Sequence, residues 1–143
     1  MTPGPPPMAL SSERVLLSAL LTGDVVTTDL GGFDSDAICE PLLRRTYETV
    51  VALRTVDLNE ITSHLKRRAV VGPAKRALLD VRDTTPSYPR SLVLAAADRL
   101  MDLWRQRQLL RVMGEVGADI RAGRLDHRGA RDRLRAHFRS VQR

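Results

Sequence analysis

The chain has 143 residues, of which 43% are hydrophobic, 3% are aromatic and one is a cysteine. This length predicts one domain that buries a core of its own, and a single cysteine excludes an intrachain disulfide and a cysteine-based metal site. No apolar run approaches the ~20 residues of a membrane-spanning helix, and the first residues lack the basic start of a signal peptide, so we expect a soluble, cytoplasmic protein without a membrane partner.

The positive charge is concentrated in the last third of the chain. Residues 1–98 contain 11 Lys and Arg against 12 Asp and Glu, whereas residues 99–143 contain 12 Arg against 5 Asp and Glu. This asymmetry indicates an acidic partner for the C-terminal part, which is either a nucleic acid or a protein surface.

The chain begins with a Pro-rich stretch, residues 1–10, that we expect to be a disordered tail because consecutive prolines do not start a helix. Ser11 or Ser12 is a suitable N-cap for the first helix, and Gly23 is a suitable stop. The pattern therefore predicts a helix that starts after these serines and ends near residue 22.

The next segment is less regular. Val25 and Leu30 are compatible with a short helix, and Phe33 is expected to anchor the core. Pro41 suits the first turn of a helix, because its missing N–H needs no partner there. That helix is predicted to run to about Arg54.

Asp57 is predicted to cap a helix over residues 58–68, with Glu60 at the third position of a capping box. A short helix over residues 74–82 follows. The prolines and short polar residues of segment 83–89 then favour a loop.

The longest predicted helix covers residues 91–122 and stops at Gly123, and Asp126 caps a final helix to about Val141. These two helices are expected to pair as an antiparallel hairpin. No segment alternates as a strand does. The sequence therefore predicts an all-α fold, with a compact helical head over residues 11–88, followed by a long helix and a basic C-terminal hairpin over residues 89–143.

The motifs of catalysis are absent from the sequence. It contains no phosphate-binding G-x-x-x-x-G-K-[ST] loop and no nucleophile in the setting of a catalytic triad. His64, His127 and His137 do not have the spacing of metal ligands. We predict no catalytic, cofactor-binding or metal-binding residues, no cofactor, and a protein that is not an enzyme.

An apolar stripe runs along the predicted hairpin. It can pack within the hairpin or form an interface with a second molecule, since two helices alone have little core. Phe138 is expected to be buried, and Cys39, in the head, to be buried or half-buried. The interface candidates are Leu103, Leu109, Leu110, Met113, Leu134, Phe138 and Val141.

The same hairpin carries a row of arginines, Arg128, Arg131, Arg135 and Arg139. The row is either a solvated face or a strip that binds phosphates or an acidic protein. No exposed aromatic side chain is expected among these residues, which weakens the case for single-stranded nucleic acid.

Five pieces of the sequence occur in the order found in the N-terminal domain of DnaB-type replicative helicases, which the chain resembles over about residues 11–122. The pieces are a Leu-rich first helix, a Phe before a helix with a central Tyr, a Val-Asp-Leu helix start, a Thr-Pro-Ser turn and an Arg-rich helix. They are Glu13 to Leu21, Phe33 with Tyr47, Val56 to Leu58, Thr85 to Ser87, and Arg105 to Arg111.

The resemblance has departures and a competitor. The connection before Val56 is short, Gly72-Pro73-Ala74 replaces a Gly-Gly piece, and the helix after Ser87 has about one extra turn. The helicase-binding C-terminal domain of bacterial primase has a similar helical fold. Either resemblance implies an interaction module of DNA replication, of the primosome, without a motor.

In such helicases the hairpins pair, the heads form a ring collar, and primase docks on the collar. The resemblance therefore implies a homo-oligomer, a dimer or ring, that binds helicase or primase. A small basic DNA-binding protein that uses the C-terminal arginines is the alternative.

Overall fold

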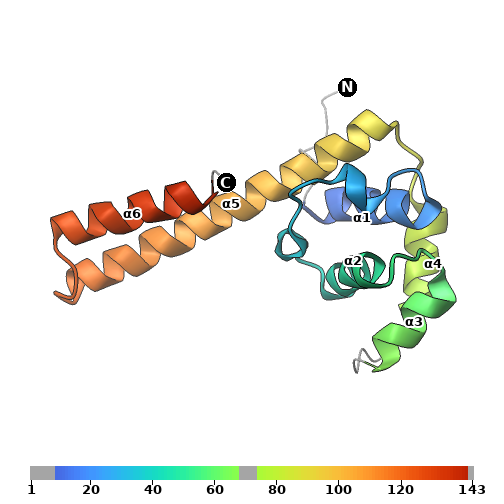
Figure 1. Ribbon diagram of the computed structural model, residues 1–143, viewed down its shortest axis with the longest axis horizontal. Coiled ribbons are helices and arrows are strands. Elements are labelled where there is room, and N and C mark those ends of the chain that lie inside the picture. Colours follow the sequence, from blue (N-terminus) through green and yellow to red (C-terminus); the bar gives the residue numbers. More distant parts are fainter. Residues whose placement is uncertain (1–8, 68–73, 142–143) are drawn as a thin grey trace. The chain divides into compact units, whose positions relative to one another are not determined.

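A computed structural model describes residues 9–67 and 74–141, and every regular element in these ranges is a helix, which confirms the all-α prediction (Figure 1). The elements are α1 (Ala9–Thr22), the 3-10 turns η1 (Thr27–Asp29) and η2 (Ser35–Ala37), α2 (Pro41–Leu53), α3 (Leu58–Arg67), α4 (Ala74–Thr84), α5 (Arg90–Arg121) and α6 (His127–Val141).

The chain divides into two compact units, a head of residues 1–101 and a hairpin of residues 102–143. The division falls within α5, later than the boundary at residues 88 and 89 that the sequence suggested. Val93, Ala97 and Leu100 follow one another at helical spacing and are buried, so the first turns of α5 belong to the core of the head.

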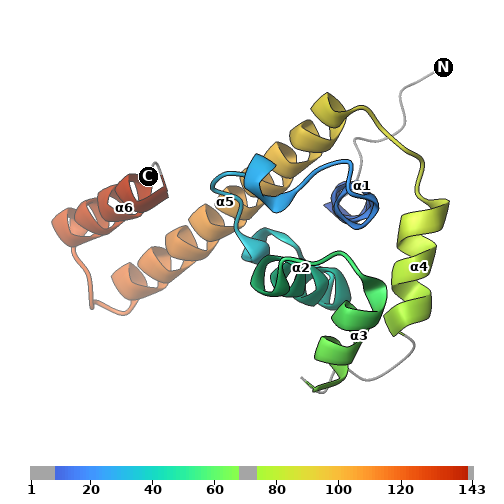
Figure 2. The same cartoon turned by 45° about the vertical axis from the view of Figure 1, so that its right-hand side comes forward.

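The core of the head is built around α1, which packs against α2 and α4 and is seen nearly end-on in Figure 2. Leu16, Leu17 and Leu20 are fully buried, which accounts for the run of leucines in this helix. Glu13 is also buried, and its Oε1 accepts a hydrogen bond of 2.8 Å from the backbone N–H of Glu40. This carboxylate ties α1 to the start of α2.

The helix ends follow the capping chemistry of the sequence. Asp57 Oδ1 accepts from the backbone N–H groups of Asn59 and Glu60 at 2.8 and 3.1 Å, so the predicted cap is confirmed. In a capping box the Glu60 side chain accepts a hydrogen bond from the backbone N–H of Asp57. Here that N–H donates to Thr55 Oγ1 at 3.1 Å instead. Gly23 ends α1 with a φ of 82°, the left-handed conformation that glycine adopts without strain.

Two helix boundaries differ from the prediction by more than one residue, and a third lies outside the described residues. Helix α1 begins at Ala9, before the predicted serine caps, so Ala9 and Leu10 belong to a helix and not to the predicted tail; residues 1–8 lie outside the described ranges. Helix α4 continues to Thr84, because its last turn is closed by a hydrogen bond of 2.6 Å from Thr84 Oγ1 to the carbonyl oxygen of Asp80. The predicted end of the third helix at Arg68 lies outside the described residues.

The segment between α1 and α2 contains two short turns instead of one helix. Val25 and Leu30 are buried at either side of η1, as their apolar character requires. Phe33 is only half-buried, and its ring meets that of Tyr47 edge-on with centroids 5.2 Å apart. Cys39 is exposed, contrary to the prediction, because the extended backbone here directs Ile38 into the core and the next side chain to the other side.

Within the described ranges, no helix combines the length and the apolar character needed to cross a membrane. The same part of the chain contains no group of three His, Cys, Asp or Glu side chains arranged to hold a metal ion.

Candidate protein interface of the hairpin

The hairpin has a small core. The second half of α5 and α6 run antiparallel side by side in both views (Figures 1 and 2). Gly123 makes the turn with a φ of 73°, and Asp126 Oδ1 caps α6 by accepting from the N–H of Gly129 at 2.8 Å, as predicted. The buried residues of the core and those packed against it are Val112, Val116, Ala130, Leu125 and Leu134.

Ion pairs join α5 and α6 along one side of the hairpin. Arg133 on α6 reaches Asp119 on α5 with 2.6 Å between Nη1 and Oδ2, and Glu115 with 3.3 Å between Nη2 and Oε2. Arg124, in the turn, lies 3.0 Å from Asp119 through Nη2. The hydrogen bonds from Arg133 and then Arg124 lower the pKa of Asp119 below its ordinary value, so this carboxylate is charged at neutral pH.

The opposite side of the hairpin carries large exposed apolar side chains, as their positions along the two helices show. Each residue turns a helix by about 100°. The buried residues Val112 and Val116 form the row of α5 that faces α6. Glu115 comes one residue before Val116, and Met113 comes one residue after Val112. Glu115 and Met113 therefore lie on opposite sides of this row. On α6, Arg133 precedes Leu134 and lies with Glu115.

Phe138 comes one turn after Leu134 and is displaced about 40° further from Arg133. It therefore lies on the same side of the hairpin as Met113. Leu110 and Ile120 share the α5 stripe with Met113, because they precede and follow it at heptad spacing. We call these four residues the apolar side. Their exposed fractions are 67% for Leu110, 52% for Met113, 47% for Ile120 and 49% for Phe138.

The predicted interface residues thus separate into two groups. Leu134 packs on the hairpin core, and Leu103 and Leu109 are half-buried on α5. The expectation that Phe138 is buried is wrong, because within the hairpin α6 has only α5 to pack against and Phe138 lies beside the row that faces it. The side chain of Val141 lies outside the described part of the chain.

The four predicted contact arginines form a second surface. Arg128, Arg131, Arg135 and Arg139 are exposed, and among the described residues they make no hydrogen bond or ion pair through their side chains. They follow one another at three- and four-residue intervals, so they share the face of α6 that points away from the hairpin core. From the first to the last, the row extends about 16 Å along the helix. We call it the arginine row.

The ion-paired side was not anticipated from the sequence. Its signal was present, because Glu115 and Asp119 are four residues apart and therefore lie on one face of a helix. Which arginine meets them depends on the register between α5 and α6. No family model matches the chain, and no curated protein or solved structure is significantly similar to it. The apolar side and the arginine row are therefore the features of the hairpin that bear on its function.

Proposed function

We propose that this chain is a non-enzymatic interaction protein that associates with a second copy of itself through the apolar side of the hairpin. The observation that supports this is the segregation of the two sides, since the ion pairs lie on one and four large exposed apolar side chains lie on the other. Contiguous exposed apolar residues of this kind mark interfaces, because their burial removes apolar surface from water.

A second copy is the best-matched occupant. Oligomers of one chain are mostly two-fold symmetric, and a two-fold contact places the same patch on both molecules. The apolar side suits such a contact because its four large side chains are about half exposed or more, while arginines border it: Arg121 of α5, whose guanidinium lies over Gly117, and those of α6. In such a contact each side chain of the patch is buried in both molecules. Four side chains per molecule supply eight to the shared core.

The resemblance to the N-terminal domain of DnaB-type helicases supports a role in DNA replication. In that family the hairpins pair and the heads form a ring collar on which primase docks. We infer that a paired form of this chain, a dimer or a ring, docks on the replicative helicase or on primase in the cytoplasm. This role places no chemistry in the chain itself.

The test is light scattering on a size-exclusion column at a series of protein concentrations and at low and high salt. An apolar interface predicts a mass of two or more chains that persists in high salt, since screening acts on charges. Addition of the host's replicative helicase or primase is expected to shift the elution of the paired form. A monomer at every concentration, with no shift, contradicts the proposal.

The arginine row favours a second candidate function, the binding of nucleic acid. Its four guanidinium groups are exposed and available, whereas Arg133 and Arg124 are occupied by carboxylates. A row of about 16 Å matches several phosphates of a duplex, whose charges are spaced about 1.7 Å along the axis. Phe138 lies beside Arg131 and Arg135 on α6, so the two candidate functions are separated by substituting different residues of one side of this helix.

A further inference from the structure

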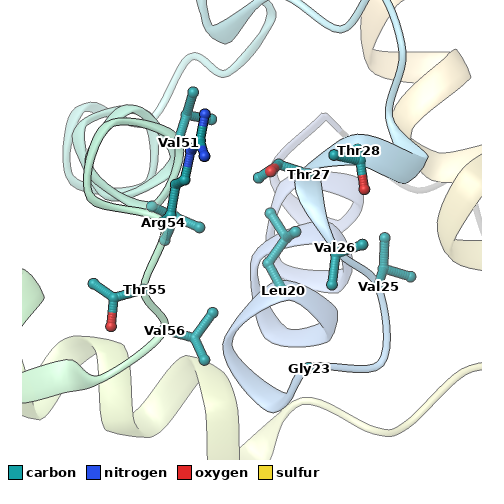
Figure 3. A pocket seen from close by; sticks show the side chains of 11 residues that line it. Leu20, Gly23, Val25, Val26, Thr27, Thr28, Val51, Arg54, Thr55 and Val56 are labelled. Atoms are coloured by element: carbon teal, nitrogen blue, oxygen red, sulfur yellow. The ribbon is translucent and has the colours of Figure 1, made fainter.

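A groove in the head lies between the end of α1, the η1 turn and the end of α2, with a volume of about 650 Å³ (Figure 3). Val51 and Arg54 form one wall and Val26 and Thr27 form the other, with Leu20 between them. All of these residues belong to the head. The groove is therefore independent of the hairpin and of its proposed function.

The groove is lined by five valines, Leu20, Gly23 and three threonines, together with one charged residue, Arg54. Three valines around it remain open to solvent, with exposed fractions of 52% for Val26, 46% for Val51 and 42% for Val56. No carboxylate is among the lining residues, and Arg54 is the one charged group. Its guanidinium makes no hydrogen bond or ion pair with the described residues.

Arg54, the charged residue of the groove, has a backbone conformation that is unusual for a residue other than glycine. Arg54 ends α2 in the left-handed conformation, with φ 53° and ψ 41°, and it is the single non-glycine residue with positive φ in the described ranges. Helices commonly end with glycine at such a position, because a Cβ atom is unfavourable there. Strained residues of this kind concentrate at binding sites.

We propose that the groove binds a segment of another protein that presents aliphatic side chains next to a carboxylate. The aliphatic side chains replace water on the valines and Leu20, and the carboxylate accepts hydrogen bonds from the guanidinium of Arg54. Three valines of the lining are about half exposed, which fits a polypeptide that covers an open surface. The charge selects an acidic partner over a basic one.

The experiment measures binding of a synthetic amphipathic peptide, with leucines at positions i, i+3 and i+7 and flanking glutamates, to the full-length protein. Titration is followed by amide chemical shifts, which report the location as well as the affinity. A peptide with lysines in place of the glutamates tests the charge, and one with serines in place of the leucines tests the aliphatic contact. We expect shifts at the groove and at least about tenfold weaker binding for both altered peptides.

Two substitutions at one position separate charge from backbone strain. Arg54→Gly removes the guanidinium and relieves the left-handed backbone, so it is expected to raise the melting temperature and to weaken binding about tenfold. Arg54→Lys keeps a positive charge and most of the affinity. Arg45→Glu, nine residues before Arg54 and about half a turn round the axis of α2 from it, is the control for net charge and leaves binding unchanged.

Val51→Asp provides an independent test of the aliphatic wall, because its side chain is half exposed and its replacement leaves the core intact. It is expected to abolish binding while the far-ultraviolet circular dichroism stays the same. The proposal is overturned if the acidic and basic peptides bind equally, if the shifts fall outside the groove, or if no peptide binds at millimolar concentration.

Discussion

Arg133 on α6 lies 2.6 Å from Asp119 on α5, measured from Nη1 to Oδ2, and this ion pair closes the side of the hairpin opposite to Phe138. The pair fixes the rotation of α6 about its own axis, because a helix that presents Arg133 to one side must present Phe138 to the other. The ion pairs thereby keep the apolar side directed toward solvent in a single molecule. This relationship links the electrostatics of the hairpin to its proposed interface.

Removal of the Asp119 charge is expected to loosen the hairpin at neutral pH. The pKa of Asp119 is lowered from 3.8, first by the hydrogen bond from Arg133 and then by that from Arg124. Because the folded-state pKa lies below the unfolded value, the stabilisation is present above about pH 4 and is lost as the pH falls through the folded-state pKa. Amide hydrogen exchange of α6 in Asp119→Asn is expected to be faster than in the wild type at neutral pH and to converge with it in acid.

Asp102→Asn is the matched control for this comparison. Asp102 pairs with Arg105 three residues along the same helix, and no hydrogen bond or ion pair joins its side chain to the described residues of α6. Its loss is expected to leave the exchange of α6 unchanged. Equal exchange in wild type and Asp119→Asn at neutral pH would show that the ion pair does not hold the hairpin.

Two glycine-to-alanine substitutions are expected to change stability in opposite directions. An added Cβ atom meets nothing within 4 Å at Gly114 or at Gly123, so packing does not decide either case. Gly123 has a φ of 73°, where alanine is strained, and Gly123→Ala is expected to lower the free energy of unfolding by about 1 kcal/mol. Gly114 lies within α5, where alanine gains up to about 1 kcal/mol. Urea unfolding measures the free energy of unfolding of both variants. If the two substitutions change it in the same direction, the assignment of Gly123 to the turn is contradicted.

Charge reversal of the arginine row tests the second candidate function. The triple variant Arg128→Glu, Arg131→Glu and Arg135→Glu is expected to abolish binding to duplex DNA in a fluorescence anisotropy titration, and wild-type affinity is expected to fall with salt, with a slope of about −0.9 per neutralised phosphate.

The control for charge reversal places the same change of net charge on the head. Its three positions are exposed, and their side chains make no ion pair with other described residues; they are Arg45, Arg67 and Arg76. Replacing these arginines by glutamate is expected to leave most of the affinity. Equal losses in the two triple variants would mean that only net charge acts, and the arginine row would then have no specific role.

The sequence predicts the helical elements well because their signals are local. Asp57 and Asp126 cap helices where a short acceptor precedes a helical pattern, and Gly23 and Gly123 end helices where the backbone turns left-handed. These signals depend on a few neighbouring residues. They are therefore readable without knowledge of the tertiary structure.

The surfaces are harder to predict because they depend on how helices meet. Phe138 follows the apolar stripe of α6, yet it is exposed because the core-facing row passes to one side of it. Arg133 has the same residue type as Arg131 and Arg135, and only the register with α5 distinguishes a paired arginine from a free one. Arg54 is unpredictable for a different reason, since the left-handed conformation there is adopted by a residue that disfavours it.

The most direct test of the central proposal is the mass of two hairpin variants measured by light scattering on a size-exclusion column. Leu110→Asp and Phe138→Asp each place a charge on the apolar side, and both wild-type side chains are half exposed or more, so the monomer is expected to fold. Ala136→Asp is the control, because Ala136 is exposed and lies two residues beyond Leu134, about 200° round the helix from the hairpin core. We predict that wild type and Ala136→Asp elute as the same oligomer and that the other two elute as monomers. An unchanged oligomer in Leu110→Asp and Phe138→Asp, with helical content preserved in circular dichroism, would contradict it.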